Sequence, residues 1–481
     1  MPNIEEFLAH NRSMIIAPAG YGKTHTIVDC VKHCKESKKC LILTHTHAGV
    51  ASIREKMKRE GVKSLKYSLE TISSFSLQYI NAFHIDKNSI PRIENGNKYF
   101  NFTLETATKI LQSKPIKDVI RSSYSHLIVD EYQDCTQQQH LFILALSNIL
   151  PTHILGDPLQ GIFGFRGNPL VNMESDVEMA GFNQNKQNLD TPWRWNNAGT
   201  AGLGHSLSMI RNSIMRQEAI DLSHYNQNIE LVIAAENEYY QRNSIAHQVI
   251  LREIKNCQTM SLLLIHPKSE NIQPRQKTIQ YFPAIKLIES IDDKGFYQYA
   301  KLFDEEQGVD LIKYILELMK SITLKSKISN WFRDDGVLKT KRNDSDKVIM
   351  NGLQMAITQL SQKKTSKNIS FLIDKIYALP QNKCSRIEFL WDFRKSLDSS
   401  QSTGNTIYES MKKNRDFIRR QGRKVQGKCI GTTLLTKGLE FDTVIVLNAH
   451  KFTNFKHLYV ALTRGCKKLI IITQNAILNL Y

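Results

Sequence analysis

The sequence predicts an α/β protein with mostly parallel sheets that carry helices on both faces. Short apolar runs alternate with helical patterns through the first 160 residues. A second region of the same kind begins near Ser261 and resumes at Ile430. Alternating strands and helices are typical of βαβ units, and such sheets bind ligands at the carboxyl ends of their strands.

The first region contains four expected strands and two expected helices. Each strand is a short apolar run of the kind that is buried in a parallel sheet. The strands are residues 14–16, 41–44, 126–129 and 152–155, and the helices are residues 24–33 and 48–59.

The second region supplies further strands at residues 261–265, from Ile430, and at residues 443–447 and 468–472. A long polar stretch with helical patterning, about 276–424, separates its parts. From Lys412 to Lys428, eight residues are Lys or Arg and one, Asp416, is acidic. Two readings of this run stay open, a solvated surface helix and a contact with a phosphate backbone.

The length, composition and net charge of the chain limit the classes of protein to which it can belong. The 481 residues suggest about three compact units, or two with large insertions. Hydrophobic residues make up 41% of the chain, which argues against a fibrous or largely disordered protein. The net charge of +18 favours a polyanionic partner, most often nucleic acid.

Several classes of protein are not expected. No apolar run approaches the roughly 20 residues of a membrane-spanning helix, and the start lacks the order of a secretory signal. The 8 cysteines are scattered without a Cys-x-x-Cys pair, which indicates reduced thiols and a cytoplasmic protein without membrane contact. Cys30, Cys34 and Cys40 are close enough to suggest a metal, although simple packing is the favoured reading.

A phosphate-binding loop is predicted where the strand ending at Ile16 meets the next helix. It consists of Ala17, Pro18, Ala19, Gly20, Tyr21, Gly22, Lys23 and Thr24, with Ala17 where the P-loop pattern usually has its first glycine. Small residues let backbone N–H groups wrap phosphates at a helix N-terminus. Lys23 would place its charge on the β- and γ-phosphates, and the Thr24 hydroxyl would bind Mg²⁺.

An acid pair, Asp130-Glu131, follows the apolar strand 126–129. Two acids after a strand often cap a helix, but beside a P-loop they suit metal-assisted hydrolysis. Asp130 would hold Mg²⁺, and Glu131 would orient and deprotonate the attacking water.

These segments resemble the motifs of UvrD/Rep-type superfamily 1 helicases. The matching residues are 17–24 (motif I), 44–46 (Ia), 71–75 (Ib), 130–134 (II), 156–167 (III), 192–194 (IV), 432–441 (V) and 459–464 (VI). The motifs stand in the family's order across residues 17–464.

The resemblance implies two RecA-like P-loop NTPase domains with mostly helical insertions and ATP between the domains. The first domain would be residues 1–190 with a short insertion at about 76–125. The second would be residues 191–275 and 425–481, with a helical accessory insertion at 276–424. Both insertions are short for the family.

The resemblance also assigns roles at the nucleotide. Gln160 would belong to the first domain's catalytic set, with Lys23 and Glu131. Arg464 would be the arginine finger of the second domain, and Arg194 would reach the γ-phosphate. Gly438 and Glu440 would bind the nucleotide, and Glu440 would contact its ribose.

A second set of residues is expected on single-stranded or partly duplex DNA. Phe163 and Phe165 occupy positions where the family stacks aromatic rings on bases, and stacking tolerates any sequence. Arg166 lies beside them in the same glycine-flanked stretch. Thr46 and Ser74 are candidates for hydroxyl contacts with phosphate.

The sequence departs from the family at residues that concern nucleotide selectivity and DNA contact or coupling more than hydrolysis. The family's adenine-reading Gln upstream of the P-loop has no counterpart, because the first Gln in the chain is Gln78. We therefore expect ATP as the substrate with looser discrimination against other nucleoside triphosphates. His45, Ser73 and Leu434 also replace usual motif residues.

Two functions follow as hypotheses. The first is an ATP-dependent DNA helicase or translocase with Mg²⁺ as cofactor, its 3′→5′ polarity implied by the family. The second is a nucleotide-hydrolysing regulatory subunit that controls a partner such as a nuclease without unwinding DNA. Short members of the family work beside nucleases, including in bacterial anti-phage systems.

Overall fold

The computed structural model describes residues 2–34, 37–84, 86, 89–91, 97–164, 168–257, 260–267, 271–289, 294–421, 425 and 427–479. The chain forms two compact units. One comprises Met1–Asn271, Lys424–Lys428 and Thr432–Tyr481, and the other comprises Ile272–Arg423 and Cys429–Gly431. No helix in these described ranges is long and apolar enough to cross a membrane.

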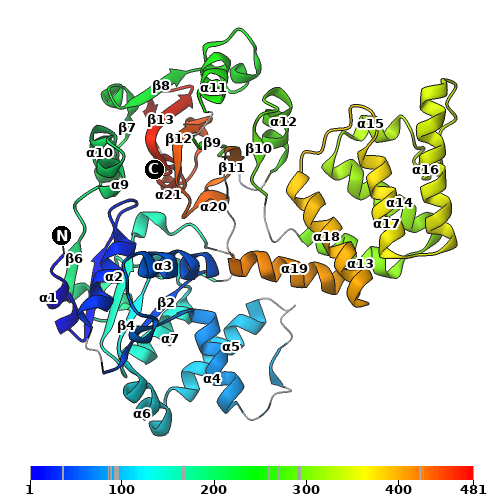
Figure 1. Ribbon diagram of the computed structural model, residues 1–481. Helices are drawn as coiled ribbons and strands as arrows, with labels where there is room; N and C mark the ends of the chain where they lie inside the picture. The colour runs from blue at the N-terminus through cyan, green and yellow to red at the C-terminus, as the bar shows by residue number, and fades with distance from the viewer. Residues whose placement is uncertain are drawn as a thin grey trace. The chain divides into compact units, whose positions relative to one another are not determined.

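The first sheet has the strand order β3-β2-β4-β5-β1-β6, and all its pairings are parallel (Figure 1). Its strands are β1 (Arg12–Ile16), β2 (Lys39–Thr44), β3 (Tyr67–Thr71), β4 (Tyr124–Val129), β5 (Thr152–Gly156) and β6 (Lys186–Asn188). Strands β4, β5 and β1 are adjacent, so the ends of β1 and β4 are separated by one strand.

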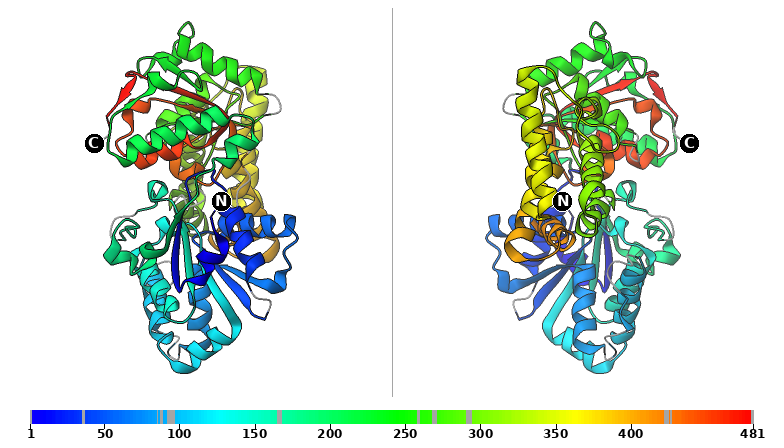
Figure 2. Two further views of the ribbon diagram at one scale, coloured as in Figure 1. Left: turned by 90° about the vertical axis from the view of Figure 1, so that its left-hand side faces the viewer. Right: turned by 90° about the vertical axis from the view of Figure 1, so that its right-hand side faces the viewer.

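Helices lie on both faces of this sheet (Figure 2). They are α1 (Ile4–Ala9), α2 (Lys23–His33), α3 (His47–Arg59), α4 (Ile72–Phe83), α5 (Asn97–Ile110), α6 (Lys114–Ser123), α7 (Gln137–Ser147) and α8 (Asp176–Met179). Phe75 of α4 and Phe142 of α7 are buried in one core with Leu41 and Leu127 of the sheet. Burial of this apolar face supplies most of the helices' stability, as in other amphipathic helices.

Side-chain caps fix where the helices begin. The Thr46 hydroxyl accepts the Gly49 N–H at the start of α3 (3.0 Å), and Thr71 accepts the Ser74 N–H at the start of α4 (3.0 Å). Thr136 and Gln139 form a capping box at α7. These caps place the first turns of α3 and α4 directly after the carboxyl ends of β2 and β3.

The second sheet of the first unit contains β9, β12, β13 and β8 in that order, paired in parallel. Its strands are β8 (Ile229–Ile233), β9 (Leu262–Ile265), β12 (Phe441–Val446) and β13 (Gly465–Thr473), and a small antiparallel pair joins β7 (Ile220–Asp221) to β14 (Ile477–Leu478). The accompanying helices are α9 (Trp193–Asn197), α10 (Ala201–Met215), α11 (Ile245–Asn256), α20 (Thr433–Thr436) and α21 (Phe455–Leu462).

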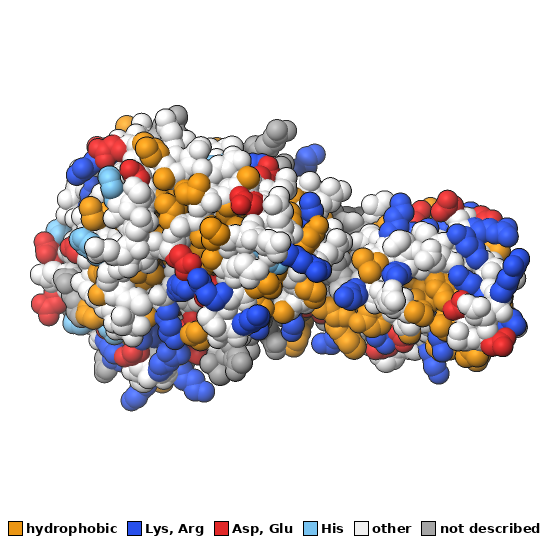
Figure 3. Space-filling view, turned by 90° about the horizontal axis from the view of Figure 1, so that it is seen from above, with side chains coloured by type: hydrophobic (Ala, Val, Ile, Leu, Met, Phe, Trp, Pro, Cys, Tyr) orange, Lys and Arg blue, Asp and Glu red, His pale blue; other side chains and the backbone are white. Residues whose placement is uncertain are grey.

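The second unit is mostly helical around its own core, which contains Phe303, Ile315, Leu372 and Phe393. Its elements are α12 (Gln273–Tyr281), β10 (Lys286–Leu287), α13 (Lys294–Glu305), α14 (Gly308–Ile322), α15 (Lys325–Ser329), α16 (Asp344–Gln362), α17 (Ser366–Tyr377), α18 (Ile387–Thr403), α19 (Ile407–Gln421) and β11 (Lys428–Gly431), which pairs with β10. Lys and Arg side chains are spread over the surface of this unit, with hydrophobic side chains between them (Figure 3).

The predicted fold class is confirmed: two parallel sheets flanked by helices form two RecA-like α/β domains. All strands expected from the sequence are present. The apolar pattern does not predict β3, β6, β7, β8, β10 or β14, which are short or partly polar. Cys30, Cys34 and Cys40 are buried, and among the described residues no three or more His, Cys, Asp or Glu side chains gather in a way that could hold a metal ion. The domain boundary near residue 190 stays a prediction.

Candidate nucleotide-binding site

The P-loop connects β1 to α2 at the carboxyl end of the first sheet. The Ala17 N–H donates to the Gly156 carbonyl at the end of β5 (2.8 Å), which fixes the start of the loop. Gly20 and Gly22 have φ angles of +79° and +93°, which side chains rarely adopt. A Cβ on Gly20 would also lie 2.9 Å from the Cβ of Arg194. The loop therefore requires glycine at position 20 for both backbone and packing.

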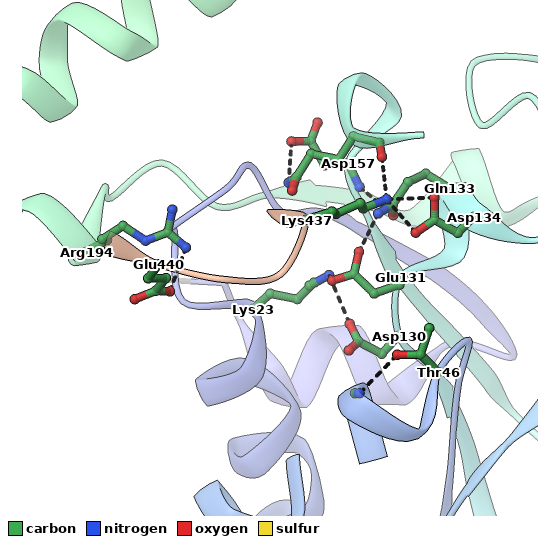
Figure 4. Close-up of polar contacts among 12 residues, drawn as sticks. Lys23, Thr46, Asp130, Glu131, Gln133, Asp134, Asp157, Arg194, Lys437 and Glu440 are labelled. Carbon is green, nitrogen blue, oxygen red and sulfur yellow. Dashed lines mark hydrogen bonds and ion pairs between the residues drawn. The ribbon is translucent and has the colours of Figure 1, made fainter. Parts of the chain in front are cut away.

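Lys23 and Thr24 occupy the first turn of α2. The Lys23 ammonium forms ion pairs with Asp130 (3.1 Å) and with Glu131 (Figure 4). Burial would lower the pKa of Lys23, but the two carboxylates outweigh it and raise that pKa above its ordinary value. Lys23 is therefore a permanent positive charge at the helix N-terminus.

The acid pair lies at the end of β4, as the sequence predicted. Burial raises the pKa of Asp130, and Lys23 opposes this rise. Glu131 has a φ of +52°, an uncommon conformation for a residue with a side chain, and Gln133 donates to its carboxylate. Loss of solvent would raise the pKa of Glu131, but Lys23 and then Lys437 lower it to about 2. Glu131 is therefore ionised at neutral pH, as a base must be.

Thr24 and Asp130 are the residues available to a divalent cation. The Oδ1 atom of Asp130 is buried and accepts no hydrogen bond, Lys23 being its ion-pair partner. A carboxylate oxygen and a threonine hydroxyl are hard ligands of the kind that Mg²⁺ prefers. The residues present therefore fit Mg²⁺.

Gln160 follows the end of β5 and joins a buried polar network. Its side-chain amide donates to Asp157 (2.9 Å), which also accepts from Arg211 of α10 (2.7 Å). Arg211 in turn reaches the Tyr459 hydroxyl of α21 (3.1 Å). Arg211 is not among the residues predicted from the sequence, since a lone arginine in a helix gives no signal of a partner 54 residues away.

The two predicted arginines lie close to the P-loop and Gln160. Arg464 is buried and its guanidinium donates to Gln160 Oε1 (3.5 Å) and to the Leu439 carbonyl (3.3 Å). Burial, and then Arg194, lower the pKa of Arg464 to about 10, so it stays charged at neutral pH. The Arg194 side chain pairs with Glu440 (2.6 Å) and lies beside it in Figure 4, while its backbone N–H donates to the Gly20 carbonyl (2.9 Å).

The loop after α20 contributes Gly438, Glu440 and Lys437. Gly438 has a φ of +81°, and Glu440 is about half exposed, with 56% of its side chain accessible. The Lys437 ammonium contacts both oxygens of Asp134 (2.7 Å to Oδ1) and the Gln160 carbonyl. Burial raises the pKa of Asp134 to about 7, against the opposing effect of Lys437. Lys437 belongs to the segment matched to motif V, but its residue type alone predicts no role.

The predicted strand-binding residues are placed as follows. Thr46 and Ser74 lie in the capping turns of α3 and α4, where the Thr71 hydroxyl also donates to Ser74 (2.8 Å). Phe163 is partly buried, with the His45 ring stacked on it at 6.3 Å and Lys437 over its ring at 4.7 Å. Phe165 and Arg166 lie outside the described residues. These assignments stay predictions.

A small pocket of about 60 Å³ opens beside the P-loop. The Trp193 indole lies against Gly22, 3.1 Å from where a Cβ would stand, and 37% of Trp193 is exposed. Its other lining residues include His25, Asp29 and Asp190. Trp193 is not among the predicted site residues. Its position next to Arg194 in the segment matched to motif IV could have indicated that it lies near the nucleotide.

Comparison with known proteins agrees with this geometry. A model of the AAA domain family matches residues 3–166, the part of the chain that holds the P-loop, the acid pair and Gln160. The chain is 24% identical over 387 residues to the Gabija protein GajB of Bacillus cereus (strain VD045). The aligned stretch covers 79% of this chain and 70% of GajB.

Two further relatives match over short stretches. One is an ATP-dependent helicase/nuclease subunit of Lactococcus lactis subsp. lactis (strain IL1403), 30% identical over 99 residues, or 20% of this chain and 8% of the relative. The other is the exonuclease/helicase subunit RexA of Lactococcus lactis subsp. cremoris (strain MG1363), 33% identical over 82 residues, or 17% of this chain and 7% of the relative. The chain thus spans only a small part of these two proteins.

Proposed function

We propose that this chain, a UvrD-like superfamily 1 protein, is an ATP-dependent DNA translocase or helicase. In this proposal it hydrolyses nucleoside triphosphate with Mg²⁺ and moves 3′→5′ along single-stranded DNA. The family relationship supports nucleotide hydrolysis, and the net charge of +18 supports a polyanionic substrate.

The arrangement of Lys23, Asp130 and Glu131 carries the proposal. The P-loop lysine and the acid pair lie within ion-pair distance at the ends of β1 and β4, where a bound triphosphate would meet them. The arrangement supports hydrolysis rather than mere binding, because a nucleotide-binding module has no use for a partly buried, ionised Glu131 there.

Each residue then has a defined task. Lys23 and the loop N–H groups would hold the β- and γ-phosphates, and Glu131 would orient the attacking water and accept its proton. Mg²⁺, held by Thr24 and Asp130, would neutralise charge that develops on the phosphate oxygens. Arg464 and Arg194 would add guanidinium donors, which match the geometry of phosphate oxygens.

Nucleotide selectivity would depend on the pocket beside the P-loop. Trp193 offers an aromatic face on which any base can stack. Carboxylates from Asp29 and Asp190 also line this pocket. We therefore expect GTP to be hydrolysed at a rate close to that of ATP.

The test is hydrolysis of ATP and of GTP by the purified protein, with and without single-stranded DNA. Lys23→Ala serves as the blank. Strong stimulation by DNA would support the proposal, and a strand-displacement assay would then separate translocation from unwinding. Hydrolysis that ignores DNA would contradict it.

The second candidate is a nucleotide-hydrolysing subunit that controls a nuclease in the cytoplasm. Two relatives carry the word subunit beside nuclease or exonuclease in their names, which favours a partner of that kind. The partly covered ring of Phe163 also favours it, because that ring is less open to bases. DNA-independent hydrolysis that changes when a nuclease is added would support this alternative.

A further inference from the structure

The Lys437 side chain touches both the predicted strand-binding ring and the hydrolysis residues. Its ammonium lies 4.7 Å from the centroid of the Phe163 ring. The same ammonium contacts Asp134 (Figure 4). It also donates to the carbonyl of Gln160. The Lys437 ammonium therefore contacts both a predicted strand-binding residue, Phe163, and a predicted hydrolysis residue, Gln160.

The environment of Lys437 is unlike that of a lysine that binds a phosphate backbone. Only 6% of its side chain and 2% of that of Asp134 are exposed, and the two form an ion pair. The ammonium of Lys437 thus already has a buried hydrogen-bonding partner. A phosphate contact would require an ammonium that faces solvent.

The ring of Phe163 contacts two other side chains, His45 and Lys437. The His45 ring stacks on it with an interplanar angle of 18°, and the Lys437 ammonium lies over it. A base that stacks on Phe163 needs a face of the same ring. A base that stacks on the face over which the ammonium lies would compete with Lys437 for Phe163.

On the hydrolysis side, Lys437 holds the backbone of Gln160. The Gln160 side chain is hydrogen-bonded to Asp157 (2.9 Å) and accepts from Arg464 (3.5 Å). Lys437 also helps to lower the pKa of Glu131. A shift of the Lys437 ammonium therefore changes the position of Gln160 and the field at Glu131.

We propose that Lys437 is a positioning residue that couples a base on Phe163 to the arrangement of Gln160 and Glu131. A strand displaces the ammonium from the ring, and the displaced ammonium changes its contacts with Asp134 and Gln160. This coupling rests on the proposed function, because it requires that a strand stimulates hydrolysis.

The test is Lys437→Met, which removes the charge and keeps an unbranched apolar side chain. We measure the strand dissociation constant by fluorescence anisotropy and the ratio of hydrolysis rates with and without strand. Strand affinity is expected to be equal or up to about threefold tighter, because a competitor for the ring is gone. The ratio of hydrolysis rates is expected to fall towards one.

Two outcomes would overturn the inference. Weaker strand binding with a shallower salt dependence would make Lys437 an ordinary phosphate contact. An unchanged ratio of rates would mean that Lys437 couples nothing. A wild-type protein whose hydrolysis ignores the strand would instead contradict the proposed function itself, so the two failures are distinct.

Three further variants control the experiment. Lys468→Met removes an ion-paired lysine of the same domain, bound to Glu253 (2.8 Å), and should leave the ratio at the wild-type value. Lys437→Arg should restore part of the coupling, which a purely structural role would not require. If Lys437→Met is poorly folded, the double variant Lys437→Met with Asp134→Asn also removes the buried acid that has lost its partner. The ratio of hydrolysis rates with and without strand is then measured on the double variant.

Discussion

The Lys23 ammonium forms ion pairs with both Asp130 and Glu131 at the start of α2. Lys23 and Glu131 are both charged at neutral pH, and each compensates the burial of the other, which is the condition under which charges persist in a low-dielectric site. A triphosphate would enter this arrangement as a further set of anionic oxygens and compete for the same ammonium.

Lys23→Ala is expected to lower the hydrolysis rate at least about a hundredfold, because no other described cation lies on the P-loop to replace it. The measurement is steady-state phosphate release at saturating ATP. Lys32→Ala, a change to an exposed lysine of the same helix paired with Glu60, should keep the wild-type rate. Near-normal release by Lys23→Ala would remove the assignment of the phosphate site.

Glu131→Gln is expected to bind nucleotide normally and to hydrolyse it about a hundredfold or more slowly, because an amide cannot accept the proton from water. Nucleotide affinity and single-turnover hydrolysis are measured on the same preparation. Asp134→Asn, which replaces an acid three residues away, is the control. It should lower the rate of single-turnover hydrolysis less than Glu131→Gln does. Wild-type turnover by Glu131→Gln would exclude it as the base.

At the scale of elements, the three central strands of the first sheet begin with a buried histidine network. His153 of β5 donates from Nδ1 to the Ser13 hydroxyl of β1 (2.7 Å), which itself donates to the Phe7 carbonyl (2.9 Å). The other ring nitrogen of His153 lies 3.0 Å from His126 of β4. Burial lowers the pKa of His153 to about 3, so it is neutral in the folded protein.

The free energy of unfolding is expected to fall as the pH drops from about 6.5 towards 3. In this window the unfolded chain protonates His153 and the folded protein does not, which favours unfolding by up to about 1.4 kcal/mol per pH unit. Urea titrations at pH 7, 6 and 5 measure this slope. His153→Gln should reduce it.

The control for this element is His224→Gln. His224 is exposed in the turn after β7, paired with Asp221 at 3.6 Å, and its replacement should leave the pH slope unchanged. An equal slope in wild type and His153→Gln would mean that other groups set the acid sensitivity.

At the scale of the whole molecule, the net charge of +18 should dominate strand binding. If about four phosphates are contacted, affinity for single-stranded DNA should fall on the order of 50-fold between about 50 and 200 mM salt, because counterions are released. A strand with an uncharged peptide backbone is the control and should show little salt dependence. A flat titration with DNA would argue against phosphate contacts.

The local features could be predicted from the amino-acid sequence: the P-loop at 17–24, the acid pair at 130–131 and the alternation that gives two parallel sheets. Each depends on residues close together in the chain, where a strand, a tight loop and a helix start leave a readable pattern. Arg194, Arg464 and Gln160 followed only from a resemblance of ordered motifs.

Contacts between side chains that are distant in the sequence become visible only in the folded protein. Lys437 and Asp134 are 303 residues apart, and Arg211 and Tyr459 are 248 apart. The ring of Phe163 is likewise covered by residues from two other segments. Nothing local marks such pairs, because a buried charge selects its partner by the three-dimensional proximity that the packing of two sheets and their helices creates.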